Sequence, residues 1–407
     1  MNKFFFLTTF IFITSCIGPV KELERQINDV YFDDVVDFTP EPLPEAFDNQ
    51  IKVNQVWDKA FEDLPLNSEI VFNDEFIYLI SEEGTFYKIS QESSDVIFSK
   101  KLDVTVKGGL FFNKNNNNYF YFIEKNNFLT KIDTKGNHIW KIKLPYSTNL
   151  KPYFYNNQVI FKFINNNIIS IDDVSGLELW AYNRKNPPLS VNIQSPLLLE
   201  DSILYTGYPG GKVVIIDPQS GSFITELTLS RPKGSTDIDR TNDVAGKLSV
   251  VKNMLFAASY NGEIAAFDRS SGAKMWSRKS SSFHGVVSDQ INLILAHEND
   301  SIYNFDITTG KTIWKNSDLA HRKISMPIIY NDYIFTVDYL GVLHIFNLTE
   351  GERVAIHKFG KDFESLINFG ELTSVRNTLN ITKIYIVQNF VFIFINNKEI
   401  IKVQIDE

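Results

Sequence analysis

Histidine and aspartate are the residues whose spacing would carry metal or acid–base chemistry in this chain of 407 residues. No two histidines stand at the i,i+2 or i,i+4 spacing that a metal site favours, so we interpret them as isolated residues on strands or at the surface. They are His138, His284, His297, His321, His344 and His357. The sequence also lacks a G-x-S-x-G elbow, a P-loop and a G-x-G-x-x-G turn after a strand. We therefore predict no catalytic residue, no metal ligand and no cofactor site.

Aspartate recurs at regular intervals, a few residues before a glycine. The clearest copy, residues 262–276, reads GEIAAFDRSSGAKMW. The aspartate position is held by Asp133, Asp172, Asp217, Asp268, Asp306 and Asn347, and the glycine position by Gly136, Gly176, Gly221, Gly272, Gly310 and Gly351. An aspartate accepts hydrogen bonds from backbone N–H groups two residues on, and glycine readily adopts the positive φ that a tight turn needs. These aspartates are therefore predicted to shape turns rather than to bind calcium.

Tryptophan completes the repeat and indicates the fold. Four of the five tryptophans stand four residues after the glycine, namely Trp140, Trp180, Trp276 and Trp314. Weaker copies flank these repeats, and successive aspartate positions lie 38 to 57 residues apart. A period of this length is typical of a propeller blade. The sequence thus predicts an all-β, eight-bladed β-propeller of four-stranded antiparallel blades.

The ring of blades is predicted to close through the two ends of the repeat region. Residues 51–60 read as a lone strand with Trp57, whereas residues 384–405 supply inner strands but no outer strand with a tryptophan. If strand 51–60 joins the C-terminal blade, the ring has eight complete blades and no exposed sheet edge at the seam.

Cys16, the only cysteine, follows a segment typical of export. Lys3 precedes a ten-residue apolar run that is too short to span a bilayer. The small residues Thr14 and Ser15 come just before Cys16, which resembles a bacterial lipoprotein signal. Residues 1–15 would be the signal peptide and Cys16 the lipid anchor. An ordinary secretory signal with an incidental cysteine is the alternative.

Residues 16–50 are predicted to be a tether, and residues 51–407 the propeller. Nine acidic and two basic residues give positions 17–50 a net charge of −7, and three prolines stiffen the end of this segment. The whole chain carries −9, of which Lys3 contributes +1, so residues 51–407 carry only −3. A nearly neutral propeller argues against nucleic acid as a partner.

Two repeats are longer than the others. One contains the polar segment 229–250, with Asp237, Asp239, Arg240 and Asp243. Long polar insertions between blades project from one face and often carry contacts. The other contains residues 359–383, in which we recognise no chemistry.

The repeat also resembles that of propellers that bind pyrroloquinoline quinone (PQQ), which raises the alternative of a periplasmic quinoprotein dehydrogenase. The resemblance implies an adjacent-cysteine disulfide and an acidic calcium pocket in those enzymes. This chain has a single cysteine, already assigned to the signal, so a non-enzymatic function is favoured.

Three segments resemble the BamB family, lipoprotein propellers of the outer-membrane β-barrel assembly (BAM) machinery. They are residues 234–244 (GSTDIDRTNDV), 257–276 (AASYNGEIAAFDRSSGAKMW) and 316–332 (NSDLAHRKISMPIIYND). The resemblance implies a periplasm-facing scaffold on the outer membrane. Its implied partners are the POTRA domains of BamA, and unfolded barrel substrates could add to its sheet edges. A generic scaffold for another envelope complex is a further alternative.

Two loops would carry the BamA contact according to this resemblance. One aligns with Leu189, Ser190, Val191 and Asn192, and the other contains Asp239, Arg240 and Asp243. The chain departs from the family pattern at Asn192, where the family has arginine, and at Ala245, where it has a second acidic residue. Asp239 and Arg240 could equally form a local pair that holds the loop in shape.

Overall fold

The computed structural model describes residues 38–61, 64–65, 69–73, 75–113, 119–191, 193–359, 383–395 and 398–406. Backbone contacts divide the chain into residues 1–40 and 41–407, and all regular structure described here belongs to the second unit. Of the first unit, only residues 38–40 are described, and they have no regular structure. No described helix is long and apolar enough to cross a membrane.

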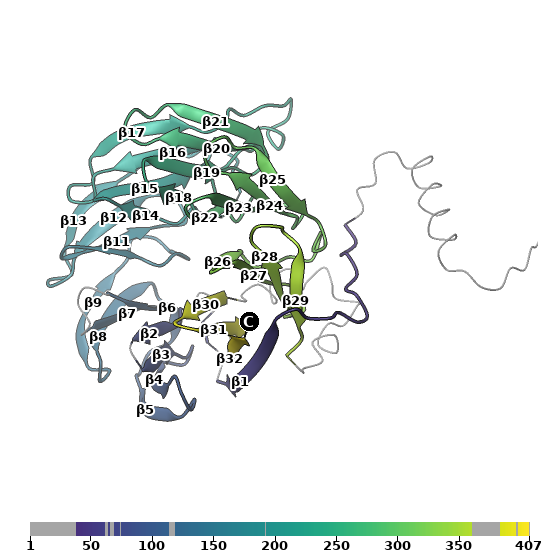
Figure 1. Cartoon of the computed structure of the whole chain (residues 1–407). Coiled ribbons are helices and arrows are strands. Elements are labelled where there is room, and N and C mark those ends of the chain that lie inside the picture. Colours follow the sequence, from purple (N-terminus) through teal and green to yellow (C-terminus); the bar gives the residue numbers. More distant parts are fainter. Residues whose placement is uncertain are drawn as a thin grey trace, which may run out of the picture. The chain divides into compact units, whose positions relative to one another are not determined.

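The second unit is an eight-bladed β-propeller, which confirms the predicted fold class (Figure 1). Each blade is a four-stranded antiparallel sheet. The first four blades contain β2 (Val71–Asn73), β3 (Phe76–Ile80), β4 (Thr85–Ser90), β5 (Val96–Lys101); β6 (Val106–Phe112), β7 (Tyr119–Glu124), β8 (Phe128–Asp133), β9 (His138–Lys143); β10 (Tyr153–Tyr155), β11 (Gln158–Lys162), β12 (Ile168–Asp172), β13 (Glu178–Tyr182); and β14 (Leu198–Glu200), β15 (Ile203–Tyr208), β16 (Lys212–Ile216), β17 (Phe223–Thr228).

The remaining blades follow the same order. They contain β18 (Ser249–Val251), β19 (Met254–Ala258), β20 (Glu263–Asp268), β21 (Lys274–Lys279); β22 (Val286–Ser288), β23 (Asn292–Ala296), β24 (Ile302–Asp306), β25 (Thr312–Asn316); β26 (Ile328–Tyr330), β27 (Tyr333–Val337), β28 (Leu343–Asn347), β29 (Arg353–His357); and β30 (Lys383–Val387), β31 (Phe390–Ile395), β32 (Glu399–Asp406), β1 (Lys52–Ala60). The second and third strands are mostly buried on both faces, because neighbouring blades cover them.

The predicted closure of the ring is confirmed. β1 pairs antiparallel with β32, from Lys52 opposite Asp406 to Ala60 opposite Glu399. Figure 1 shows β1, in purple, beside β32, in yellow. Trp57 of β1 donates from Nε1 to the carbonyl of Gln91 in the first blade at 3.1 Å. The boundary between blades 8 and 1 therefore has the same kind of hydrogen bond as the boundaries at Trp140, Trp276 and Trp314.

That contact is a tryptophan of one blade lying on the turn of the next. The indole N–H donates to the carbonyl that follows the aspartate position: Trp140 to Asp173 (3.0 Å), Trp276 to Ile307 (2.9 Å) and Trp314 to Leu348 (3.0 Å). The rings lie on the turn glycines, where any side chain would overlap them; the pairs are Trp180 with Gly221, Trp276 with Gly310 and Trp314 with Gly351. The tryptophans thus pack between blades, as the repeat predicts.

The aspartates shape the turns, also as predicted. Asp268 Oδ1 accepts from the backbone N–H of Ser271 (2.8 Å) and from the hydroxyls of Ser270 and Ser271. These hydroxyl bonds, together with the backbone bond, lower the pKa of Asp268 to about 2. The Gly272 N–H donates to the Asp268 carbonyl at 2.8 Å, with a φ of +71° at the glycine. The other oxygen, Asp268 Oδ2, accepts from Asn253 Nδ2 in the neighbouring turn at 2.6 Å, so the carboxylate is used by two adjacent turns of one blade.

Strand polarity divides the blades into two faces. Connections between blades and the turns between second and third strands lie on one face, and the remaining turns lie on the other. We call the first the connector face. It includes the connections 183–197, 229–248, 280–285 and 317–327, and the turns 209–211 and 259–262. Segment 359–383 lies outside the described residues except for its two ends.

The tryptophan–glycine contact predicts different costs for two similar substitutions. Gly272→Ala and Gly310→Ala both place a Cβ at positive φ, which costs about 1 kcal/mol. In addition, the new Cβ of Gly310→Ala overlaps the Trp276 ring, whereas that of Gly272→Ala meets only the flexible end of Leu227. We expect Gly310→Ala to lower the free energy of unfolding by about 2 kcal/mol more than Gly272→Ala in urea. Equal losses would contradict the role assigned to the ring contact.

Candidate interaction site on the connector face

Several segments of the connector face are bonded to one another around Asp243. Its Oδ2 accepts from the Val191 N–H at 2.6 Å, and its Oδ1 accepts from the Gly210 N–H at 3.0 Å. Its backbone carbonyl accepts from the Tyr260 N–H at 2.9 Å. One residue thus joins the connection between blades 3 and 4 to turns of blades 4 and 5.

Asp243 is a buried carboxylate rather than a surface charge, because only 2% of the residue is exposed. Burial raises its pKa above the usual value, although the two backbone donors act in the opposite direction. The repeat aspartates on the opposite face shape tight turns, whereas Asp243 joins loops that are far apart in the sequence. Its carboxylate is occupied within the chain.

The residues around Asp243, 241–247, lie across three blades, and we call them the anchor segment. The Val244 N–H donates to the Tyr208 carbonyl in blade 4 at 3.2 Å, and the Lys247 N–H donates to the His284 carbonyl before blade 6 at 2.9 Å. A side chain at Gly207 would overlap Val244, so the segment approaches the strand at backbone distance. Thr241, Asn242 and Ala245 are buried as well.

Residues 231–240 project from the anchor segment, and all ten are exposed. Thr236 and Asp239 bond reciprocally: the Thr236 N–H donates to Asp239 Oδ2, and the Asp239 N–H donates to Thr236 Oγ1, both at 3.1 Å. Arg240 Nε donates to the Gly234 carbonyl at 3.1 Å. No ion pair joins Asp239 to Arg240 in this described stretch; the side chain of each bonds instead to the backbone of the projection. Ile238 is 74% exposed at its tip.

Residues 189–191 and 193, which we call the loop 189–193, are the apolar part of the site. Leu189 is 45% exposed, and Ser190 and Val191 are half-buried. Ile193 is 46% exposed and extends the apolar surface. Sequence reasoning missed Ile193. Its position two residues after Val191 could have indicated it, because alternate residues of an extended segment share a face.

The structure therefore brings some of the predicted site residues together and leaves others apart. Val191 and Asp243 are in direct contact, whereas Asp239 and Arg240 lie on the projection. Asn192 and Cys16 are outside the described residues. Leu189, Ser190 and the projection remain predicted contact residues, whereas the carboxylate of Asp243 is buried and bonded to the backbone of other loops.

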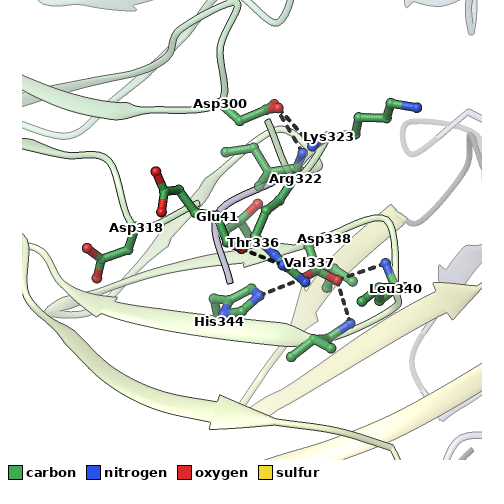
Figure 2. Close-up of polar contacts among 12 residues, drawn as sticks. Glu41, Asp300, Asp318, Arg322, Lys323, Thr336, Val337, Asp338, Leu340 and His344 are labelled. Atoms are coloured by element: carbon green, nitrogen blue, oxygen red, sulfur yellow. Dashed lines mark hydrogen bonds and ion pairs between the residues drawn. The ribbon is translucent and has the colours of Figure 1, made fainter. Parts of the chain in front are cut away.

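A second polar cluster, on blade 7, resembles a catalytic arrangement (Figure 2). Arg322 donates to Asp338 Oδ2 through Nε (2.8 Å) and Nη2 (2.6 Å), and His344 Nε2 lies 3.1 Å from the same oxygen. Burial alone would raise the pKa of Asp338, but the hydrogen bond and charge of His344, with the charge of Arg322, hold it below the usual value. Burial lowers the pKa of His344.

This cluster holds the chain just before β1 rather than a substrate. Arg322 Nη1 donates to the Glu41 carbonyl at 2.7 Å, and the Glu41 N–H donates to the Ala320 carbonyl at 3.0 Å. Further along, the Gln50 N–H donates to the Val354 carbonyl in β29 at 2.9 Å. His344 and Asp338 are both buried, so the pair serves packing. Across the described ranges, no group of three His, Cys, Asp or Glu side chains could hold a metal ion.

Comparison with known proteins places these features in one family. The family model described as "Outer membrane protein assembly factor BamB" matches residues 116–316. A relative of that name from Burkholderia pseudomallei is 25% identical over 318 residues, covering 78% of this chain and 82% of the relative. The Escherichia coli protein of that name is 34% identical over 176 residues, covering 43% of this chain and 45% of the relative.

A solved structure agrees with the fold. The crystal structure of BamB from Moraxella catarrhalis superposes with a TM-score of 0.73 at 20% sequence identity, covering 87% of this chain and all of the other. The matched family region contains the loop 189–193, the projection and the anchor segment.

The bridging role of Asp243 predicts the effect of Asp243→Asn. An asparagine has one acceptor oxygen, so either the Val191 or the Gly210 N–H would face an amide NH₂ group. We expect a loss of about 1–3 kcal/mol in the free energy of unfolding and faster hydrogen exchange at the Val191 amide. The matched control is Asp239→Asn, whose side chain is exposed and can keep its single acceptor role. Unchanged exchange at Val191 in Asp243→Asn would show that the bridge does not hold the loop.

Proposed function

Because this chain belongs to the BamB family of outer membrane protein assembly factors, we propose that it binds the POTRA domains of BamA through its connector face. It is a non-catalytic scaffold that takes part in outer membrane protein assembly. The observation that carries the proposed contact is the bonding of the loop 189–193 to the anchor segment through Asp243. That bond presents exposed apolar side chains on a rigid base.

The apolar side chains suit a protein partner. Leu189 and Ile193 are about half exposed, and a buried anchor at the centre of an interface supplies most of the binding energy. The projection 231–240 adds polar groups beside an exposed Ile238. A loop already held in its binding shape loses little conformational freedom on association. Asn192 stands where the family pattern has an arginine, so this position supplies no charge. The apolar side chains of Leu189 and Ile193 would then be the main source of affinity.

The alternatives differ in what they predict. A quinoprotein dehydrogenase would bind a quinone with calcium, but the relatives are named assembly factors, and the chain is accordingly not an enzyme. A scaffold of another envelope complex would co-purify with proteins other than BamA. Identifying the proteins that co-purify with this chain from its own membranes therefore separates the second alternative from the proposal.

The chain acts at the outer membrane, on the periplasmic side, in keeping with the role named for its relatives. We propose that a lipid on Cys16 anchors it there and that residues 16–50 are the tether to the propeller. The support for this is the apolar segment before Cys16 and the acidic, proline-containing sequence after it. Several acyl chains on one residue give stable attachment.

The proposed contact predicts a loss of binding in Leu189→Glu. A carboxylate at this position would have to lose water at the interface, so we expect at least about tenfold weaker binding to the BamA POTRA domains. Titration of the purified POTRA region by calorimetry measures the dissociation constant. The control is Leu179→Glu. Leu179 is 50% exposed and lies on β13, the outer strand of blade 3, outside the loop 189–193. Equal affinities of the two variants would contradict the assignment of this loop.

The proposed anchor predicts that Cys16→Ser releases the protein from the membrane. Without the thiol, no lipid can be attached, and the chain should move from the membrane fraction to the soluble periplasmic fraction. Membrane flotation with detection of the propeller measures the distribution, and Ser15→Ala is the control that keeps the thiol. Continued flotation of Cys16→Ser would assign membrane attachment to another part of the complex.

A further inference from the structure

Lys162 is a buried lysine beneath the connector face. It is the last residue of β11, in blade 3, and only 1% of it is exposed. Its Nζ donates to Thr206 Oγ1 (2.9 Å), to the Gly207 carbonyl (2.7 Å) and to the Ser195 carbonyl (3.1 Å). An ammonium has three N–H donors, so all of them are used. The Tyr208 ring centroid lies 4.6 Å from Nζ and offers its electron-rich face.

This arrangement has no counter-ion. None of the described carboxylates lies within ion-pair distance of Lys162, and burial lowers its pKa well below the usual value. A charged group surrounded only by neutral dipoles is costly to bury, and an apolar side chain of similar length would fill the same place more cheaply. The distinctive contribution of Lys162 is therefore the placement of the three oxygen atoms that it binds.

Two of these oxygens belong to blade 4, and the third belongs to the connection that carries the loop 189–193. Ser195, two residues beyond Ile193, accepts from Lys162 through its carbonyl. Its hydroxyl donates to the Gly246 carbonyl of the anchor segment at 2.8 Å and accepts from the Gly207 N–H at 3.0 Å. Lys162 thus holds the point where the loop, blade 4 and the anchor segment meet.

The connection that carries the loop 189–193 is consequently held at two points. Val191 is bonded to Asp243, and Ser195 is bonded to Lys162 and to Gly246. Ile193 lies between these two points, and Leu189 lies two residues before the first of them. If the bonds at either point were lost, the loop could adopt other conformations, in which Leu189 and Ile193 are no longer exposed together.

We propose that Lys162 is a positioning residue of the partner-binding surface, holding the loop 189–193 in its binding shape through Ser195. The inference rests on the proposed function, because it assumes that this loop binds the partner. Lys162 is buried and makes no contact with the partner itself. It sets affinity by keeping the free loop in the conformation that the complex requires.

The test is Lys162→Met in the full mature chain, compared with Lys402→Met. Lys402 is a matched control: it is buried in blade 8, donates to the Gln91 carbonyl at 3.0 Å and has its Nζ 3.7 Å from the Phe390 ring centroid. We expect Lys162→Met to accelerate amide hydrogen exchange in residues 191–195 and to weaken binding to the purified POTRA region by about tenfold. Lys402→Met should leave both quantities unchanged, whatever its effect on unfolding.

A combined variant separates positioning from general destabilisation. If Lys162 acts through the loop, Lys162→Met should cause no further loss of binding in the Leu189→Glu background. A similar loss in both backgrounds, or unchanged exchange and affinity in Lys162→Met alone, overturns the inference. Unchanged affinity in Leu189→Glu alone overturns the proposed function instead. If Lys162→Met does not fold, Thr206→Val removes one of the three acceptors and should give smaller changes in the same direction; no change there also overturns the inference.

Discussion

Blade packing in this propeller depends on the tryptophan rings of four blades, each of which lies on a glycine of the next blade. The ring needs a flat surface without a side chain, and the turn needs a residue with positive φ, so one glycine satisfies both requirements. The indole N–H then bonds to the carbonyl beside the same turn. Turn geometry, blade spacing and blade orientation are therefore set together. Trp57 makes the same indole N–H bond between blade 8 and blade 1, although no glycine lies beneath its ring.

A rigid ring allows its connections to be specialised without loss of the fold. The opposite face is shaped by exposed aspartates that bond within their own blade, whereas the connector face has buried polar groups that join segments distant in sequence. A buried carboxylate and a buried ammonium each cost free energy to desolvate. Their positions on either side of one apolar loop indicate that its order is the property they serve, since simple stability would be reached more cheaply with apolar residues.

Sequence reasoning recovered the parts of this structure that depend on neighbouring residues. The aspartate, the glycine and the tryptophan lie within nine residues of one another, so their turn and its outer strand could be predicted, and Trp57 without a repeat indicated the closing strand. Asp243 was recognised as important but interpreted as an exposed contact. Its burial depends on Gly210 and Val191, which are 33 and 52 residues away. Ser195 and Lys162 belong to no recognisable sequence motif, because their hydrogen-bond partners come together only in the folded chain.

The pairing of β1 with β32 makes one blade depend on both ends of the propeller region. Among the described strands of the propeller, β1 is the first and β32 is the last. The other seven blades each consist of consecutive strands, so none of them needs β1. A chain without β32 would leave β1 and β31 with open sheet edges, with which other strands could pair. Ring closure therefore requires both ends of the propeller region, and truncation at either end would disrupt the same blade.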